Sequence, residues 1–91
     1  MNNQTRKGLT ELHGKLEDVA STLEEIKGEI EIVKDEEQEK YDNMPESLQS
    51  GEKGEAMQAA VEELENAFNS LESAFDEINN ALENIDNASS N

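Results

Sequence analysis

Few side chains in this sequence are of a type that does chemistry. His13 is the only histidine, and the chain has no cysteine. A general base such as His13 needs a nucleophile or a second positioned group beside it, and only scattered Ser and Thr residues are available. We therefore expect His13 to pair with a neighbouring acid at the surface, and we expect a protein that is not an enzyme. Without cysteine, thiolate catalysis and Cys-ligated zinc or iron–sulfur sites are excluded.

Carboxylates are the one abundant functional group. The 91 residues include 23 Asp and Glu against 7 Lys and Arg, a net charge of −16. Di-metal sites in helical bundles need acids that point inward, and the inward positions described below are all apolar. Calcium loops and Gly-rich phosphate loops are absent, so we expect no metal and no cofactor. The charge argues against direct binding to nucleic acid or an anionic membrane, which both need Lys and Arg.

Two long segments carry apolar residues at spacings that alternate between three and four. In the first segment they are Leu9, Leu12, Leu16, Val19, Leu23, Ile26, Ile30 and Val33. In the second they are Met57, Val61, Leu64, Phe68, Leu71, Phe75, Ile78, Leu82 and Ile85. This is a heptad repeat, whose positions are lettered a to g and whose a and d residues face a partner helix. It predicts two long helices rather than a disordered acidic chain.

The segment between the two repeats is rich in residues that end helices. It holds the only proline, Pro45, together with Gly51 and Gly54. Helices end at or before the residue that precedes a proline, and such clusters mark turns. We expect a single domain over residues 1–91, with a helix at about 5–41, a connector at 42–53, a helix at about 54–88 and a frayed C-terminal tail.

The two repeats match when the chain is folded back on itself. Pairing residues whose numbers sum to 94 gives eight consecutive layers of an a residue against a d residue, from Leu9/Ile85 to Val33/Val61. The same register predicts three contacts between flanking e positions: His13 with Asp86, Lys27 with Glu72, and Lys34 with Glu65. We predict an all-α fold, an antiparallel two-helix coiled-coil hairpin without strands.

Alanines recur every seven residues at the g position of the second helix. This Ala column consists of Ala60, Ala67, Ala74, Ala81 and Ala88. Small residues let another helix approach closely, so the first four predict an oligomer face on which two hairpins form a four-helix bundle dimer or a higher oligomer. The alternative is that alanine is simply a good helix former on a half-exposed flank.

The connector resembles a known group of sequences. The stretch Asp42-Asn43-Met44-Pro45-Glu46-Ser47-Leu48-Gln49, followed by an Ala/Glu/Leu heptad helix, is similar to small acidic helical-hairpin proteins of bacteriophages and prophages over about residues 35–88. That family brings no activity, substrate or cofactor, and the resemblance implies the cytoplasm of a bacterial host cell. In shape the chain is also similar to the secreted hairpins of the WXG100 class, but it has no Trp for their Trp-x-Gly turn.

Three functions remain open at this stage. The first is a non-enzymatic interaction protein that binds a host or phage protein through the connector, with four candidate residues: Tyr41, Met44, Pro45 and Leu48. The second is a DNA mimic that inhibits a host nucleic-acid-binding or defence protein through six acidic-face candidates: Glu62, Glu65, Glu72, Asp76, Glu83 and Asp86. The third is a virion or assembly component. We expect no signal peptide and no membrane segment, because apolar runs are too short.

Overall fold

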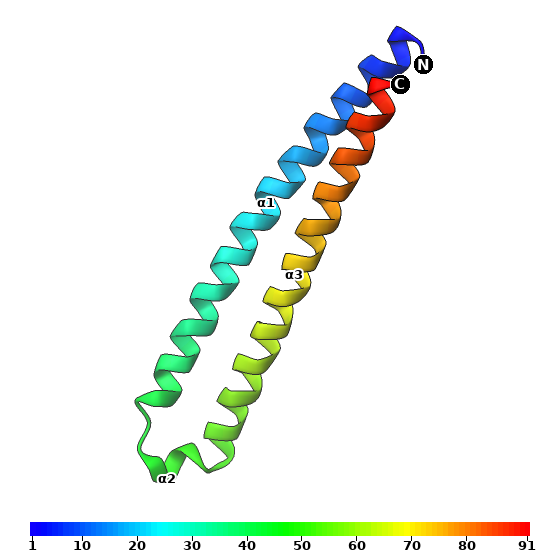
Figure 1. Cartoon of the computed structure of the whole chain (residues 1–91). Coiled ribbons are helices and arrows are strands. Elements are labelled where there is room, and N and C mark those ends of the chain that lie inside the picture. Colours follow the sequence, from blue (N-terminus) through cyan, green and yellow to red (C-terminus); the bar gives the residue numbers. More distant parts are fainter.

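The computed structural model describes all 91 residues as a helical hairpin (Figure 1). Helix α1 spans Asn3–Asp42, the short helix α2 spans Glu46–Gln49, and helix α3 spans Glu52–Ser90. Helices α1 and α3 lie side by side and antiparallel, α2 lies where the chain reverses, and both termini meet at the opposite end. The all-α helical hairpin predicted from the two repeats is confirmed.

Local side chains explain where the helices begin and end. The side-chain oxygen of Asn2 caps α1 by accepting a hydrogen bond from the amide of Thr5 at 2.8 Å. At the other end, the amide of Asn43 donates to the carbonyl of Glu39 at 3.0 Å. Pro45 prevents α1 from continuing, and its carbonyl accepts the amide of Leu48 at 2.9 Å in the single turn of α2. The reversal is therefore built from a proline turn.

The hairpin is a thin rod that hides little apolar surface. It measures 69 × 14 × 13 Å. Its accessible surface is 6459 Å², against about 5,300 Å² for a compact monomer of the same mass. Ala20, at 7% exposure, is the only buried apolar residue. The other residues between the helices are half-covered at most. No helix has a stretch long and apolar enough to cross a membrane.

Helix α1 packs through a different face from the one predicted. Its a row (Leu9, Leu16, Leu23 and Ile30) is half-buried, as expected. Its d row (Leu12, Val19, Ile26 and Val33) remains 42–53% exposed, so the prediction that these four side chains form full layers with α3 is wrong. The e row (His13, Ala20, Lys27 and Lys34) is half-buried or buried instead. Relative to the predicted hairpin, α1 is turned by about 50° about its own axis.

Helix α3 keeps its predicted face. All nine of its heptad apolar residues, from Met57 to Ile85, are half-buried. Four members of the Ala column, Ala67, Ala74, Ala81 and Ala88, are also half-buried, and Ala60 is exposed. The difference from prediction thus lies in the rotation of α1 alone.

Gly54 marks the closest approach between α2 and α3. The residue is buried, and a Cβ atom at this position would overlap the carbonyl of Gln49 and lie 2.7 Å from its Cα. Only glycine leaves room for this backbone contact. Gly28, in the middle of α1, is different, because a Cβ there would meet nothing within 4 Å.

We expect Gly54→Ala and Gly28→Ala to have opposite effects on stability. The first substitution forces the backbone of α2 away from α3 and should lower the free energy of unfolding by about 1–3 kcal/mol. The second removes a helix-interior glycine from an open site and should raise it by up to about 1 kcal/mol. Thermal unfolding followed by circular dichroism measures both. Equal stabilisation by the two alanines would show that the contact at Gly54 has no energetic weight.

Candidate functional site

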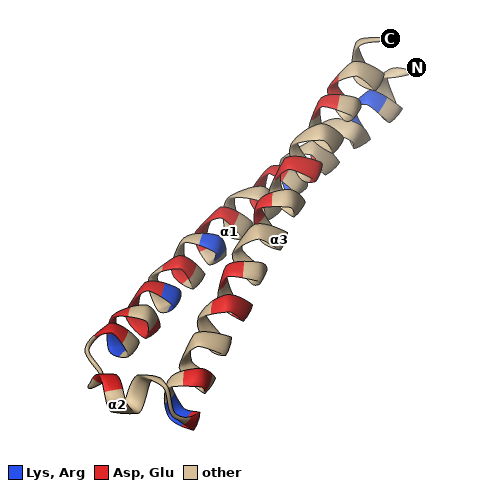
Figure 2. Cartoon of the chain, turned by 60° about the horizontal axis from the view of Figure 1, so that its bottom comes forward, with Lys and Arg blue, Asp and Glu red and all other residues tan.

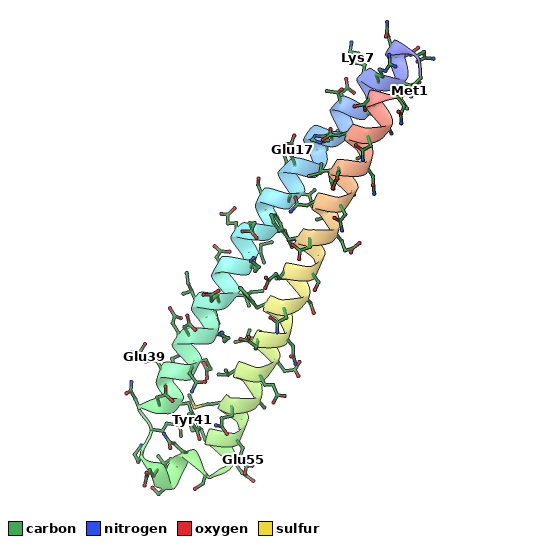
Figure 3. The ribbon with its side chains drawn as sticks, viewed as in Figure 1. Met1, Lys7, Glu17, Glu39, Tyr41 and Glu55 are labelled. Carbon is green, nitrogen blue, oxygen red and sulfur yellow. The ribbon has the colours of Figure 1, made fainter.

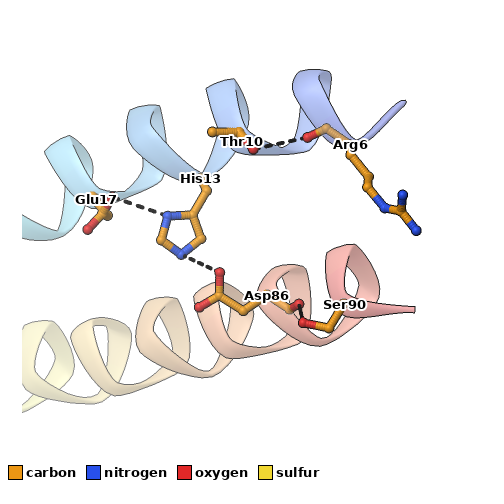
Figure 4. Close-up of polar contacts among 6 residues, drawn as sticks. All are labelled: Arg6, Thr10, His13, Glu17, Asp86 and Ser90. Carbon is orange, nitrogen blue, oxygen red and sulfur yellow. Dashed lines mark hydrogen bonds and ion pairs between the residues drawn. The ribbon is translucent and has the colours of Figure 1, made fainter. Parts of the chain in front are cut away.

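Polar contacts join α1 and α3 along one side of the seam, and Figure 4 shows the one between His13 and Asp86. His13 Nε2 lies 3.1 Å from Asp86 Oδ1, and its Nδ1 lies 3.1 Å from Glu17 Oε1. Lys34 Nζ donates to Glu65 Oε2 at 2.7 Å. The two contacts between helices are those predicted from the sequence, so the register is confirmed. We call this side, where the e rows of the two helices meet, the charged side.

Lys27 lies in the middle of the charged side. Its Nζ lies 5.4 Å from the ring centroid of Phe68 and 5.7 Å from that of Phe75, within the range of cation–π attraction. It forms an ion pair with Glu24 at 2.9 Å rather than the predicted pair with Glu72. The hydrogen bond that Lys27 donates to Glu24 raises the pKa of Lys27, and the charges of Glu72 and Asp76 raise it further. The ammonium group of Lys27 therefore contacts Glu24 of its own helix and the two phenylalanine rings of α3.

The four connector candidates divide into two pairs. Pro45 and Leu48 are exposed, Leu48 to 52%, whereas Tyr41 and Met44 are half-buried. Tyr41 continues the e row seven residues after Lys34, and Figure 3 shows it at the reversing end of the hairpin between α1 and α3. The structure therefore places Tyr41 at the end of the seam, and leaves Pro45 and Leu48 as the freely accessible apolar residues of the connector.

The connector is held to α1 by a side chain. The side-chain nitrogen Nε2 of Gln49, in α2, donates to the backbone carbonyl oxygen of Tyr41, in α1, at 3.0 Å. Together with the proline turn and the close contact at Gly54, this bond fixes α2 relative to both long helices. We call the exposed surface of Pro45, Glu46, Ser47 and Leu48 the tip.

The acidic-face candidates do not form one cluster. Asp and Glu are spread along both long helices (Figure 2). Glu65 and Asp86 are engaged with Lys34 and His13. The other four candidates, Glu62, Glu72, Asp76 and Glu83, are exposed. No group of three or more His, Asp or Glu side chains is placed so that it could hold a metal ion.

Sequence reasoning missed two elements of this arrangement. The e row of α1 was assigned only to flanking ion pairs, although Ala20, the small residue in that row, indicates close approach to α3. Gly54 was read only as part of a turn, and nothing in its sequence context reports the contact with Gln49. The chain matches no protein-family model, no curated protein sequence and no solved structure at a significant level. Its own side chains are therefore the guide to its function.

The stability contributed by Lys34 should depend on alkaline pH. The hydrogen bond that Lys34 donates to Glu65, and the charges of Glu65, Asp35 and Glu31, raise the pKa of Lys34 above its ordinary value of 10.5. A raised pKa means that the folded state holds the proton more tightly than the unfolded state. The contribution is therefore complete at neutral pH and is lost as pH rises beyond 10.5 through the folded-state pKa.

Comparing wild type with Lys34→Met at neutral and at strongly alkaline pH tests this point. We expect Lys34→Met to lower the melting temperature at pH 8, and we expect the difference to shrink above the lysine pKa. Lys40→Met is the matched control, because Lys40 is 69% exposed and 3.9 Å from Glu37, a pair that contributes little. A difference for Lys34→Met that is the same at both pH values would assign the effect to packing of the side-chain stem.

Proposed function

We propose that this protein is a non-enzymatic interaction protein whose rigid hairpin presents its tip to a protein partner. The observation that carries the proposal is Leu48. Its side chain is 52% exposed, although hydrogen bonds to Pro45 and Tyr41 hold the turn that bears it. A large apolar side chain on a fixed turn is a ready anchor for a partner.

Physical reasons favour binding through such an anchor. A preorganised turn loses little conformational entropy when it docks, so more of the contact energy appears as affinity. A few buried apolar anchors usually account for most of the binding free energy of an interface. Glu46 and Ser47 precede Leu48 in the chain and are exposed, so polar groups are available for the rim of an interface centred on Leu48.

The chemistry of the tip also describes its partner. Leu48 and Pro45 fit a small apolar pocket, and the net charge of −16 favours a pocket bordered by Lys and Arg. The resemblance of the connector to small acidic phage and prophage proteins suggests a host or phage protein in the cytoplasm of a bacterial cell. Binding then requires neither a cofactor nor a metal.

The exposed acids of α3 support a second candidate function, in which the protein acts as a DNA mimic. Glu62, Glu72, Asp76 and Glu83 are all exposed and lie on one helix. They are spread over 22 residues, or about 30 Å of helix axis, whereas duplex DNA carries one charge per about 1.7 Å. The low charge density makes this the less favoured candidate.

Capture of proteins from a bacterial host lysate by the immobilised chain distinguishes the two functions. We expect Leu48→Ser to weaken binding of the captured partner by about tenfold or more, because an interface anchor is lost. Ile32→Ser is the matched control, since Ile32 is 59% exposed but lies on α1, about 15 Å along the helix axis before its end at Asp42. Circular dichroism checks that both variants keep their helicity.

The same capture experiment with a charge-neutralised variant tests the DNA-mimic candidate. Changing Glu62, Glu72 and Glu83 to Gln should weaken binding only modestly, and raising the salt concentration should not abolish it. Loss of the partner in the charge variant or at high salt, with retention in Leu48→Ser, would reject the tip and support the mimic.

A further inference from the structure

The two unpaired apolar rows of the hairpin lie on the same side. In an antiparallel helix pair, the e rows meet on one side of the seam and the g rows meet on the other. The pairs His13–Asp86 and Lys34–Glu65 mark the charged side. The d row of α1 is turned away from that side, and the Ala column occupies the g positions of α3. The side opposite the ion pairs is therefore apolar on both helices, and we call it the apolar face.

The apolar face combines a row of large side chains with a row of small ones. The d row of α1 consists of large side chains that are 42–53% exposed, and Val19, Leu23 and Ile26 line a shallow depression on this flank. The Ala column beside it consists of small ones. Large residues on one helix thus run parallel to small residues on the other along most of the rod.

The register sets the level of each large residue against the Ala column. In the pairs His13–Asp86 and Lys34–Glu65, the two residue numbers sum to 99. The hydrogen bond from Arg6 to the Ser89 carbonyl joins residues whose numbers sum to 95. Ile26 is therefore level with residues 69–73 of α3, between Ala67 and Ala74. By the same rule each d-row residue is level with a gap between two alanines: Leu12 at 83–87, Val19 at 76–80 and Val33 at 62–66.

We propose that the apolar face binds a second copy of this chain, with α1 of each copy packed on α3 of the other and both tips at the same end. A two-fold axis along the rod preserves the level of every residue, so each d-row side chain enters a gap between two alanines of the second copy. This is the knob-into-hole relation of a four-helix bundle. The inference does not depend on what the tip binds.

The area of the face fits such a dimer. A side of 69 × 14 Å corresponds to about 970 Å², and a stable interface buries about 800 Å² on each partner. The monomer also needs this cover, because its accessible surface exceeds that of a compact chain and only Ala20 is buried among its apolar residues. Pairing two faces would turn half-covered seams into a closed core.

Charge selects the relative orientation of the two copies. From Glu55 onward, α3 carries nine acids and no base, whereas α1 carries six of the seven basic residues of the chain together with twelve acids and is therefore the less acidic helix in net terms. Tips at opposite ends would stack α3 on α3 and bring like charges together. Tips at the same end place α1, the less acidic helix, on α3. Lys15, exposed at a g position of α1, then faces the acidic helix of the second copy, in the same row as Glu29 and Glu36.

Sedimentation equilibrium tests the dimer with matched variants. We expect wild type and Ile32→Glu to be dimeric and Ile26→Glu to be monomeric. Ile32 is even more exposed than Ile26 but occupies a c position outside the apolar face. Ala67→Leu should weaken the dimer by about tenfold or more, because it fills a gap between alanines. A monomeric wild type at high concentration, or a dimer strengthened by Ala67→Leu, would overturn the proposal.

A spin label at the tip tests the orientation. The chain has no cysteine, so Ser47→Cys, in the exposed turn of α2, gives one unambiguous attachment site. We expect electron–electron dipolar spectroscopy of the dimer to show a distance below half of the 69 Å rod length. A distance close to the full length would place the tips at opposite ends and contradict the packing of α1 on α3.

Discussion

The cation of Lys27, held over Phe68 and Phe75, fixes which face of α1 meets α3. In a chain of net charge −16, the few cations of α1 are best placed where they neutralise the acids of α3. Lys34 does so through Glu65, and on the other side of Lys27 the imidazole of His13 contacts Asp86. Small Ala20 lets the helices approach between them. Together these four residues turn α1 toward the charged side.

The rotation of α1 leaves its d row exposed to water and gives the hairpin two different sides. The d row of α1 loses the cover that a symmetric a/d seam would provide, so about half of each side chain remains in contact with water. The consequence is a hairpin with a charged side, where the helices hold each other, and an apolar face that is free for another chain. The tip is separate from both, because the proline turn and the contact at Gly54 fix it at the end of the rod.

The heptad repeats were enough to predict the hairpin, because spacing along a helix directly sets which residues share a face. The register was also predictable, since the e-position pairs His13–Asp86 and Lys34–Glu65 are the same in either rotation of α1. The rotation of α1 was not predictable, because an a/d pattern shows that a row of side chains is covered but not which chain covers it. Tyr41 continues the e row of α1 and is half-buried, a position that its place beside the connector did not indicate.

The tip shows a similar division. Pro45 and the breaker residues around it located the turn, and the exposure of Leu48 agrees with its choice as a binding candidate. The contact of Gly54 with Gln49 depends on how α3 returns past α2, which no local sequence feature encodes. Local patterns therefore predicted where the tip lies, and tertiary packing decided which of its side chains remain accessible.

The central claim is that the a row and the d row of α1 serve two different interfaces, one within the hairpin and one between copies. Urea unfolding of Ile30→Ala and Ile26→Ala across a wide range of protein concentration tests it most directly. Ile30→Ala should lower the free energy of unfolding by about 1–3 kcal/mol at every concentration. Ile26→Ala should have its main effect only at concentrations where the wild type is associated. Equal, concentration-independent losses for both variants would show that the two rows belong to one seam and would contradict the account.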